Sequence, residues 1–183
     1  MLKILFALFV LVQAPFSLSQ QKATQYLQLK DKLDRPLDGY CLDVVGSGQY
    51  IRFDMPLTAH NCKGPQVYAD EVVEYRTDKT LYFPAYKGCV TVMGLNDRAL
   101  SGNSLMLKEC GIEQPFLNAK NFQRFEFNEA GQIRLEGSQL CIAVGDESHT
   151  TYSKEHRWRN LFVTKCDVVQ PKYSSWKLIP AGN

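Results

Sequence analysis

The sequence reads GYCLDV from Gly39 to Val44, and the chain repeats this pattern twice. The second copy is GCVTV at Gly88–Val92, and the third is LCIAV at Leu140–Val144. Each copy follows a short apolar run, and each is followed some 20 residues later by a second cysteine. The copies recur roughly every 50 residues, which is the spacing of a repeat architecture. The chain is therefore expected to consist of three related units, at about 24–76, 77–128 and 129–183.

The chain has six cysteines, two in each expected unit. An even number of cysteines in a secreted chain is typical of disulfides, and six cysteines allow 15 pairings. A zinc site is the competing interpretation, but the cysteines of each pair lie far apart in sequence. The repeat selects one pairing: Cys41–Cys62, Cys89–Cys110 and Cys141–Cys166.

Residues 1–19 have the features of a secretory signal peptide. Lys3 gives a positive start, residues 4–12 are apolar, and the small residues at 17–19 suit cleavage before Gln20. An uncleaved anchor is the alternative, but the apolar run is shorter than the roughly 20 residues that span a bilayer. We therefore predict a secreted protein without a membrane span, extracellular or, in a bacterium, periplasmic.

The composition favours one domain, at residues 24–181, and gives no reason to expect nucleic acid as a partner. The formal net charge is +2, and the charges are dispersed. The densest basic stretch, residues 154–159, is short and interrupted by Glu155. Phosphate binding needs a concentrated basic face, which this sequence lacks.

The chain between the repeats predicts an all-β fold. Its apolar runs are short, they are separated by turn residues, and none has a sustained helical period. Three such units cannot each bury an apolar face alone, so they are expected to close around one shared core. The strands expected outside the repeated stretches are 26–29, 50–53, 72–75, 104–107, 122–127 and 161–163. The polar segment 145–160 is expected to be an enlarged surface loop of the third unit.

These motifs resemble the ricin B-type lectins, a β-trefoil family with pseudo-threefold symmetry. The family repeat carries Cys-Leu-Asp-Val or a similar strand, a second cysteine, and a Gln-x-Trp element that packs in the core. The core element corresponds here to Gln123–Phe125 and Ser174–Trp176, and it departs from the pattern at Glu71–Val73. The resemblance implies a single β-trefoil with one disulfide in each repeat and a carbohydrate as ligand.

The resemblance places the only complete sugar pocket in the first unit. In the family, the aspartate of the Cys-x-Asp-Val strand accepts hydrogen bonds from two adjacent hydroxyls, and such charge-assisted bonds are strong. Asp43 has this position, whereas Thr91 and Ala143 replace it in the other units. The same resemblance assigns the sugar-stacking position to His60, and it adds Thr58 and Asp70 to the expected site. Asp43 could instead be a surface or turn-capping carboxylate, and His60 could be an ordinary surface residue.

A secreted protein-binding module, of the inhibitor or signalling type, is the alternative function. The segment 145–160 contains rings and cations, and Arg157 and Trp158 are residue types enriched at interaction hot spots. Trp158 could instead fold back onto the domain. We do not expect an enzyme, because no recognisable nucleophile accompanies His60 and Asp43 and no phosphate-binding loop is present. The three histidines are not spaced like metal ligands, so neither a metal nor a cofactor is expected.

Overall fold

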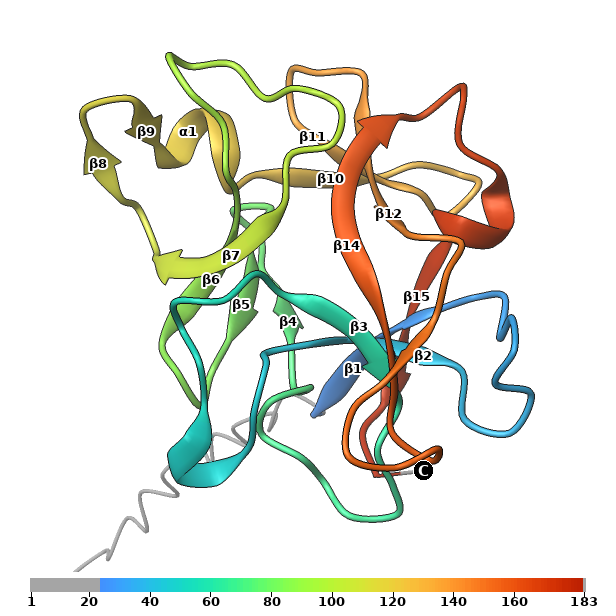
Figure 1. Cartoon of the computed structure of the whole chain (residues 1–183). Helices are drawn as coiled ribbons and strands as arrows, with labels where there is room; N and C mark the ends of the chain where they lie inside the picture. The colour runs from blue at the N-terminus through green and yellow to red at the C-terminus, as the bar shows by residue number, and fades with distance from the viewer. Residues whose placement is uncertain (1–23, 183) are drawn as a thin grey trace, which may run out of the picture.

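The computed structural model describes residues 24–182, so the expected signal peptide lies outside the described residues. Within this range the protein is all-β, as predicted, with short strands joined by turns (Figure 1). One helix of four residues, α1 (Ala119–Phe122), and two 3-10 turns, Gly48–Tyr50 and Pro171–Tyr173, are the helical elements of the described chain. None of them has the length and apolar character that crossing a membrane would require.

The strands form three antiparallel groups of four. The first group contains β15 (Trp176–Pro180), β1 (Gln25–Leu29), β2 (Tyr40–Asp43) and β3 (Thr58–Asn61). The second contains β4 (Glu74–Tyr75), β5 (Leu81–Phe83), β6 (Gly88–Val92) and β7 (Leu105–Glu109). The third contains β10 (Phe125–Phe127), β11 (Ile133–Leu135), β12 (Leu140–Val144) and β14 (Arg157–Lys165). Two short hairpin arms complete the fold: β13 (His149–Thr150) against β14, and β8 (Glu113–Gln114) against β9 (Leu117–Asn118).

Strand β14 joins the first group to the third. It pairs with β12 along its C-terminal half and with β3 along its N-terminal half. The two groups and β13 therefore make one nine-stranded, curled sheet, while the second group remains a separate four-stranded sheet. This connection brings the third unit against the first, and the candidate site lies where they meet.

The three disulfides have the pairing that the repeat predicted. Cys41 bonds to Cys62, Cys89 to Cys110 and Cys141 to Cys166, with Cα–Cα distances of 4.9, 5.0 and 5.0 Å. Each bond links the third strand of a four-stranded group to the residue that directly follows the fourth strand. In the chain-entropy model, closing a loop of this length contributes about 3 kcal/mol.

One apolar core is shared by all three units. Side chains from each repeated stretch are in it, including Leu42, Val90 and Ile142, each at most 1% exposed. The residues expected at the Gln-x-Trp positions, Val73, Phe125 and Trp176, are equally buried. Trp176 also satisfies its indole N–H, which donates to the Ile142 carbonyl oxygen at 3.0 Å. The prediction that these residues pack in the core is confirmed.

Three sequence expectations for local structure were wrong. The strand expected at 122–127 is shorter, because Phe122 ends α1 and β10 begins only at Phe125. Residues 50–53 do not form a strand: the chain turns tightly at Gly46, whose φ is +96°, and a Cβ there would lie 2.2 Å from the Tyr50 carbonyl oxygen. Segment 145–160 is not simply a loop, because its first part forms β13 and its last part belongs to β14. The longer β14 follows from pairing with β3, a partner far away in sequence that local patterns cannot reveal.

Candidate functional site

The candidate site lies on one face of the sheet formed by β2, β3, β14 and β13. Cys41, His60, Trp158 and His149 are successive cross-strand partners across these four strands. Directly opposed residues in a sheet project from the same face. The two regions singled out in the sequence, the first unit and the third-unit insertion, therefore share one surface.

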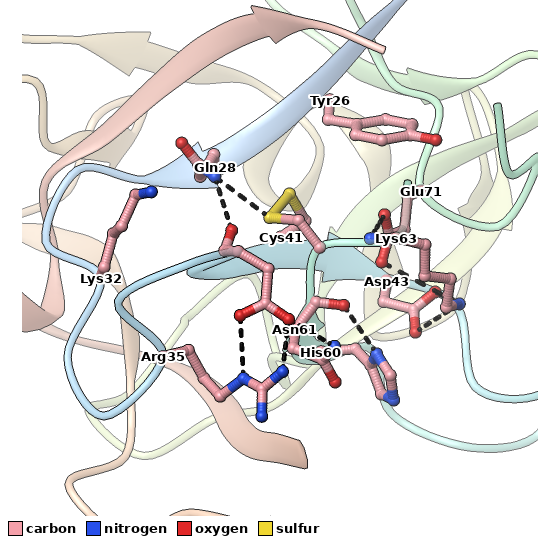
Figure 2. The surroundings of a disulfide bond; sticks show 12 residues. Tyr26, Gln28, Lys32, Arg35, Cys41, Asp43, His60, Asn61, Lys63 and Glu71 are labelled. Atoms are coloured by element: carbon pink, nitrogen blue, oxygen red, sulfur yellow. Dashed lines mark hydrogen bonds and ion pairs between the residues drawn. A yellow bond between two sulfur atoms is a disulfide. The ribbon is translucent and has the colours of Figure 1, made fainter. Parts of the chain in front are cut away.

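Asp43 lies at the end of β2 and is buried, with 3% of its surface exposed. Its carboxylate oxygens lie 3.2 and 3.3 Å from the ammonium nitrogen of Lys63 (Figure 2). The same ammonium donates to Asp70 at 2.5 Å, and Asp70 is also only 3% exposed. The structure thus brings Asp43 and Asp70 together, but through Lys63, and it places neither carboxylate in open contact with solvent. An exposed anionic acceptor at Asp43, as the resemblance implied, is not what the structure has.

Glu71 adds a third carboxylate to this group, and it is fully buried. Its Oε2 accepts a hydrogen bond from the Lys63 backbone N–H at 2.9 Å (Figure 2). Its Oε1 has no hydrogen-bond partner and lies 4.0 Å from the Lys63 ammonium. We name Asp43, Lys63, Asp70 and Glu71 the acid cluster. It contains three carboxyl groups and one ammonium group.

Burial sets the proton affinities in the acid cluster. It raises the pKa of Glu71 to about 8, although the Lys63 charge opposes the change. Burial also raises the pKa of Asp43 well above its usual value, with Glu71 and Asp70 adding to the effect. Burial alone would lower the pKa of Lys63, but the surrounding carboxylates raise it above its usual range. Lys63 therefore stays charged, while protons neutralise part of the acid around it.

His60 lies on β3 and is 8% exposed, so it is not the open stacking ring that the resemblance implied. Its Nδ1 lies 2.9 Å from the Asn61 carbonyl oxygen. Burial, with a smaller effect from the positive charge of Lys63, lowers the pKa of His60 to about 4. The imidazole is therefore neutral at pH 7.

A second ring, Trp158, lies beside His60 on the neighbouring strand. Trp158 is half-buried, and the His149 ring packs against it with centroids 5.0 Å apart. Two residues further along β14, the exposed Asn160 is opposite Thr58, which in turn is opposite Asp43. Thr58 is half-buried. This face therefore presents the ring of Trp158, the amide of Asn160 and the hydroxyl of Thr58. We name these three residues the Trp158 platform.

Two tyrosine rings also lie near the acid cluster. The Tyr68 ring centroid lies 5.9 Å from the Lys63 ammonium. Tyr86 meets Phe53 edge to face, with centroids 5.4 Å apart. Burial, with smaller effects from Asp70 and Asp43, raises the pKa of Tyr86 to about 12.

The third-unit insertion is tied to the domain by its own polar residues. Arg157 bonds to Ser148 and lies 3.5 Å from Asp34, and its backbone N–H donates to Asn61 Oδ1 at 2.9 Å. Arg159, 5% exposed at its side chain, donates to Asp34 at 2.5 Å. The Arg157 guanidinium is thus occupied within the chain, and Trp158 is folded back onto the sheet. The exposed ring of the insertion is instead Tyr152.

One group of described residues has the arrangement of a cation site. Asp43, His60 and Glu71 each offer one ligand atom, and these atoms lie within 4.8 Å of one another. The Lys63 ammonium lies among the same carboxylates, so this group already has a cation from the chain itself. Sequence reasoning did not assign Lys63 or Glu71 to the site: Lys63 lies in no motif, and Glu71 was noted only as a departure from the Gln-x-Trp element.

Comparison with solved structures finds a likeness to the solution structure of the mdaA-1 domain. The TM-score is 0.58, and the match covers 85% of this chain and 88% of that one at 14% sequence identity. At that identity the likeness describes the fold alone. No protein-family model matches the chain, and no curated protein matches it.

Proposed function

We propose that this chain is a secreted carbohydrate-binding module, built as a β-trefoil of the ricin B type, with one sugar site where β3 of its first unit meets β14 of its third unit. The site consists of the Trp158 platform in front of the acid cluster. The single observation that carries the proposal is that Trp158, Asn160 and Thr58 project from one face beside a buried ionic group.

Recurring hydrogen bonds support the trefoil part of the proposal. The backbone N–H of Val73 donates to the Gln25 carbonyl oxygen at 2.9 Å. The backbone N–H of Phe125 donates to the Lys79 carbonyl oxygen at 2.8 Å, and that of Trp176 donates to the Gly131 carbonyl oxygen at 2.8 Å. The three donors are the three residues expected at the core position of the repeat. Their equivalent bonds, with one disulfide in each group of four strands, are what pseudo-threefold symmetry requires.

The chemistry of the Trp158 platform fits a pyranose. An aromatic ring packs against the apolar face of a sugar, while side-chain amides and hydroxyls at the edge hydrogen-bond to its hydroxyl groups. Asn160 offers an amide with two donors and an acceptor, and Thr58 offers a hydroxyl. Lys63, 16% exposed at its side chain, is the charged group nearest the solvent, and the carboxylates of Asp43 and Asp70 hold it in place. In this arrangement Asp43 acts through Lys63 and not by direct contact with the ligand.

The test is retention on immobilised glycans, after a glycan array has identified the sugar. Trp158→Ala and Asn160→Ala should each abolish retention, while circular dichroism shows that the fold is kept. Tyr152→Ala is the matched control, because Tyr152 is a fully exposed ring of the same insertion. The proposal fails if the wild-type protein binds no glycan, or if Trp158→Ala is retained as well as the wild type.

The exposed ring of Tyr152 favours the second candidate function, a protein-binding module. The insertion that carries it is anchored through Asp34, so the tip is presented from a rigid base. A partner recovered by the wild type and lost on Tyr152→Ala, but not on Trp158→Ala, would support this candidate over sugar binding.

A further inference from the structure

All three histidines of the chain lie on or directly beside neighbouring strands. His60 is on β3, His149 is on β13, and His156 immediately precedes β14. His60 and His149 are both cross-strand partners of Trp158, and His156 is two residues before it. These positions all project from the same face. Residues separated by 89 and 96 positions in sequence are thus gathered around one tryptophan.

His60 has one nitrogen free to bind a metal. A carbonyl oxygen can only accept a hydrogen bond, so Nδ1 must carry the proton that it shares with the Asn61 carbonyl oxygen at 2.9 Å. Nε2 of the neutral ring therefore keeps its lone pair. An N–H···O=C bond of this kind is the outer contact that orients histidine ligands in metal sites.

His156 lies next to that ring. The centroids of the two imidazoles are 5.7 Å apart, and the ring planes are tilted by 42°. Two imidazoles that share one tetrahedral metal at a metal–nitrogen distance of about 2.0–2.1 Å have centroids about 5.2 Å apart. The observed separation is close to that value, and His156 is exposed, so its side chain can make the small adjustment. The bond from Arg157 N–H to Asn61 Oδ1, at 2.9 Å, fixes the backbone that carries His156 against β3.

We propose that His60 and His156 form a two-histidine site for a transition-metal ion of the zinc, nickel or copper(II) class, completed by water. These ions prefer imidazole nitrogen, whereas the oxygen-rich group of Asp43 and Glu71 would favour harder ions. The two ligands come from the first unit and from the third-unit insertion. A bound ion therefore cross-links the insertion to β3, at the edge of the Trp158 platform. This proposal does not depend on sugar binding.

The test is titration of the purified protein with Zn²⁺ by calorimetry, with His156→Ala as the variant. His156 is exposed, so its removal should leave the fold intact. Affinity should fall by more than about tenfold, since changes in the outer shell of metal sites alone cost about 10- to 100-fold. His149→Ala is the matched control, because His149 shares the face but packs on Trp158. It should bind Zn²⁺ as the wild type does.

A second measurement identifies the ligands directly. With Cu²⁺ as the probe, electron paramagnetic resonance should show two coordinated nitrogens in the wild type and in His149→Ala, and one in His156→Ala. Saturating Zn²⁺ should also slow proteolysis of the insertion in the wild type but not in His156→Ala. The proposal is overturned if the wild type takes up no Zn²⁺, if His156→Ala binds it as tightly as the wild type, or if His149→Ala loses as much affinity as His156→Ala.

Discussion

Glu71 makes the same hydrogen bond in the first unit as Gln123 makes in the second. Glu71 Oε2 accepts from the Lys63 N–H at 2.9 Å, and Gln123 Oε1 accepts from the Gly111 N–H at 2.9 Å. Lys63 and Gly111 each follow the second cysteine of a disulfide. The far ends of the two side chains differ: the Gln123 amide donates to Thr91 and to the Glu109 carbonyl oxygen, both at 2.8 Å, whereas Glu71 Oε1 has no partner.

Glu71→Gln should stabilise the protein at alkaline pH. The raised pKa of Glu71, about 8 against a usual 4.5, means that its contribution is complete below pH 4.5 and is lost as pH rises through 8. The wild type should therefore lose up to about 1.4 kcal/mol per pH unit within that window. Glu71→Gln should flatten this slope in urea unfolding measured from pH 5 to pH 9.

The reciprocal change, Gln123→Glu, is the matched control for that prediction. It places a carboxyl group beside Thr91 and the Glu109 carbonyl oxygen without a nearby ammonium. Gln123→Glu should destabilise the protein, and its free energy of unfolding should fall with rising pH more steeply than that of the wild type. Equal pH slopes for the wild type and Glu71→Gln would show that Glu71 does not hold the proton.

Lys63→Met should be strongly destabilising. It removes the ammonium from three buried carboxyl groups, and breaking a buried ion pair by deleting one partner costs about 3–5 kcal/mol. Protonation of Asp43 and Glu71 offsets part of this cost, so the loss should be larger at pH 8 than at pH 5. Free energies of unfolding from urea titrations at the two pH values measure it.

Lys79→Met is the comparison for Lys63→Met. Lys79 also bridges two carboxylates, those of Glu126 and Glu136, but its side chain is 36% exposed. Solvent screens such pairs, so this change should be mild and nearly independent of pH. If the two variants lost similar free energies of unfolding, burial would not be the reason why the Lys63 ion pairs matter for stability.

The fold could be predicted from sequence to the extent that its signals are local. The repeated stretch around Cys41, Cys89 and Cys141 selected the disulfide pairing, and alternating apolar residues marked the core. The strand expected at 50–53 was wrong, because Gly46 turns the chain before the apolar residues can pair. The length of β14 was also missed, since it depends on β3, about 100 residues away.

The candidate site was harder to predict than the fold. Asp43 and Asp70 do lie together, but both are paired with Lys63, and His60 lies opposite Trp158 of a distant strand. Nothing in the local sequence marks Lys63 as the partner of two aspartates. Likewise, sequence spacing gave no reason to group His60 with His156, because only the pairing of β3 with β14 brings them together.

His60 should make the protein less stable in mild acid. Its pKa, about 4 against a usual 6.5, is lowered by burial, so its contribution is present above pH 6.5 and is lost as pH falls toward 4. Glu71 changes stability in the opposite direction over part of this range, so the comparison is best made with Glu71→Gln as background. Adding His60→Gln to that background should remove the acid slope in thermal unfolding between pH 6.5 and pH 4.5. If stability still falls between pH 6.5 and pH 4.5 in the double variant, a group other than His60 is responsible for the acid slope.

Asp34→Asn should loosen the third-unit insertion. The Asp34 carboxylate accepts from Ser148 at 2.6 Å, from Tyr40 at 2.8 Å and from the buried Arg159 at 2.5 Å, and it thereby joins the first unit to the insertion. These hydrogen bonds lower its pKa although burial opposes them, so the link should weaken as pH falls. Replacing the carboxylate leaves the Arg159 guanidinium with carbonyl partners only, at an expected cost of about 1–2 kcal/mol.

The measurement for Asp34→Asn is limited proteolysis or hydrogen exchange of segment 145–157, where faster cleavage or exchange is expected. Asp54→Asn is the matched control, because Asp54 pairs with Arg52 on the open surface and should change neither rate. Since β14 also carries Trp158, the looser insertion should weaken glycan retention without abolishing the fold. Unchanged protection of segment 145–157 in Asp34→Asn would show that strand pairing with β3, and not the Asp34 link, holds the insertion in place.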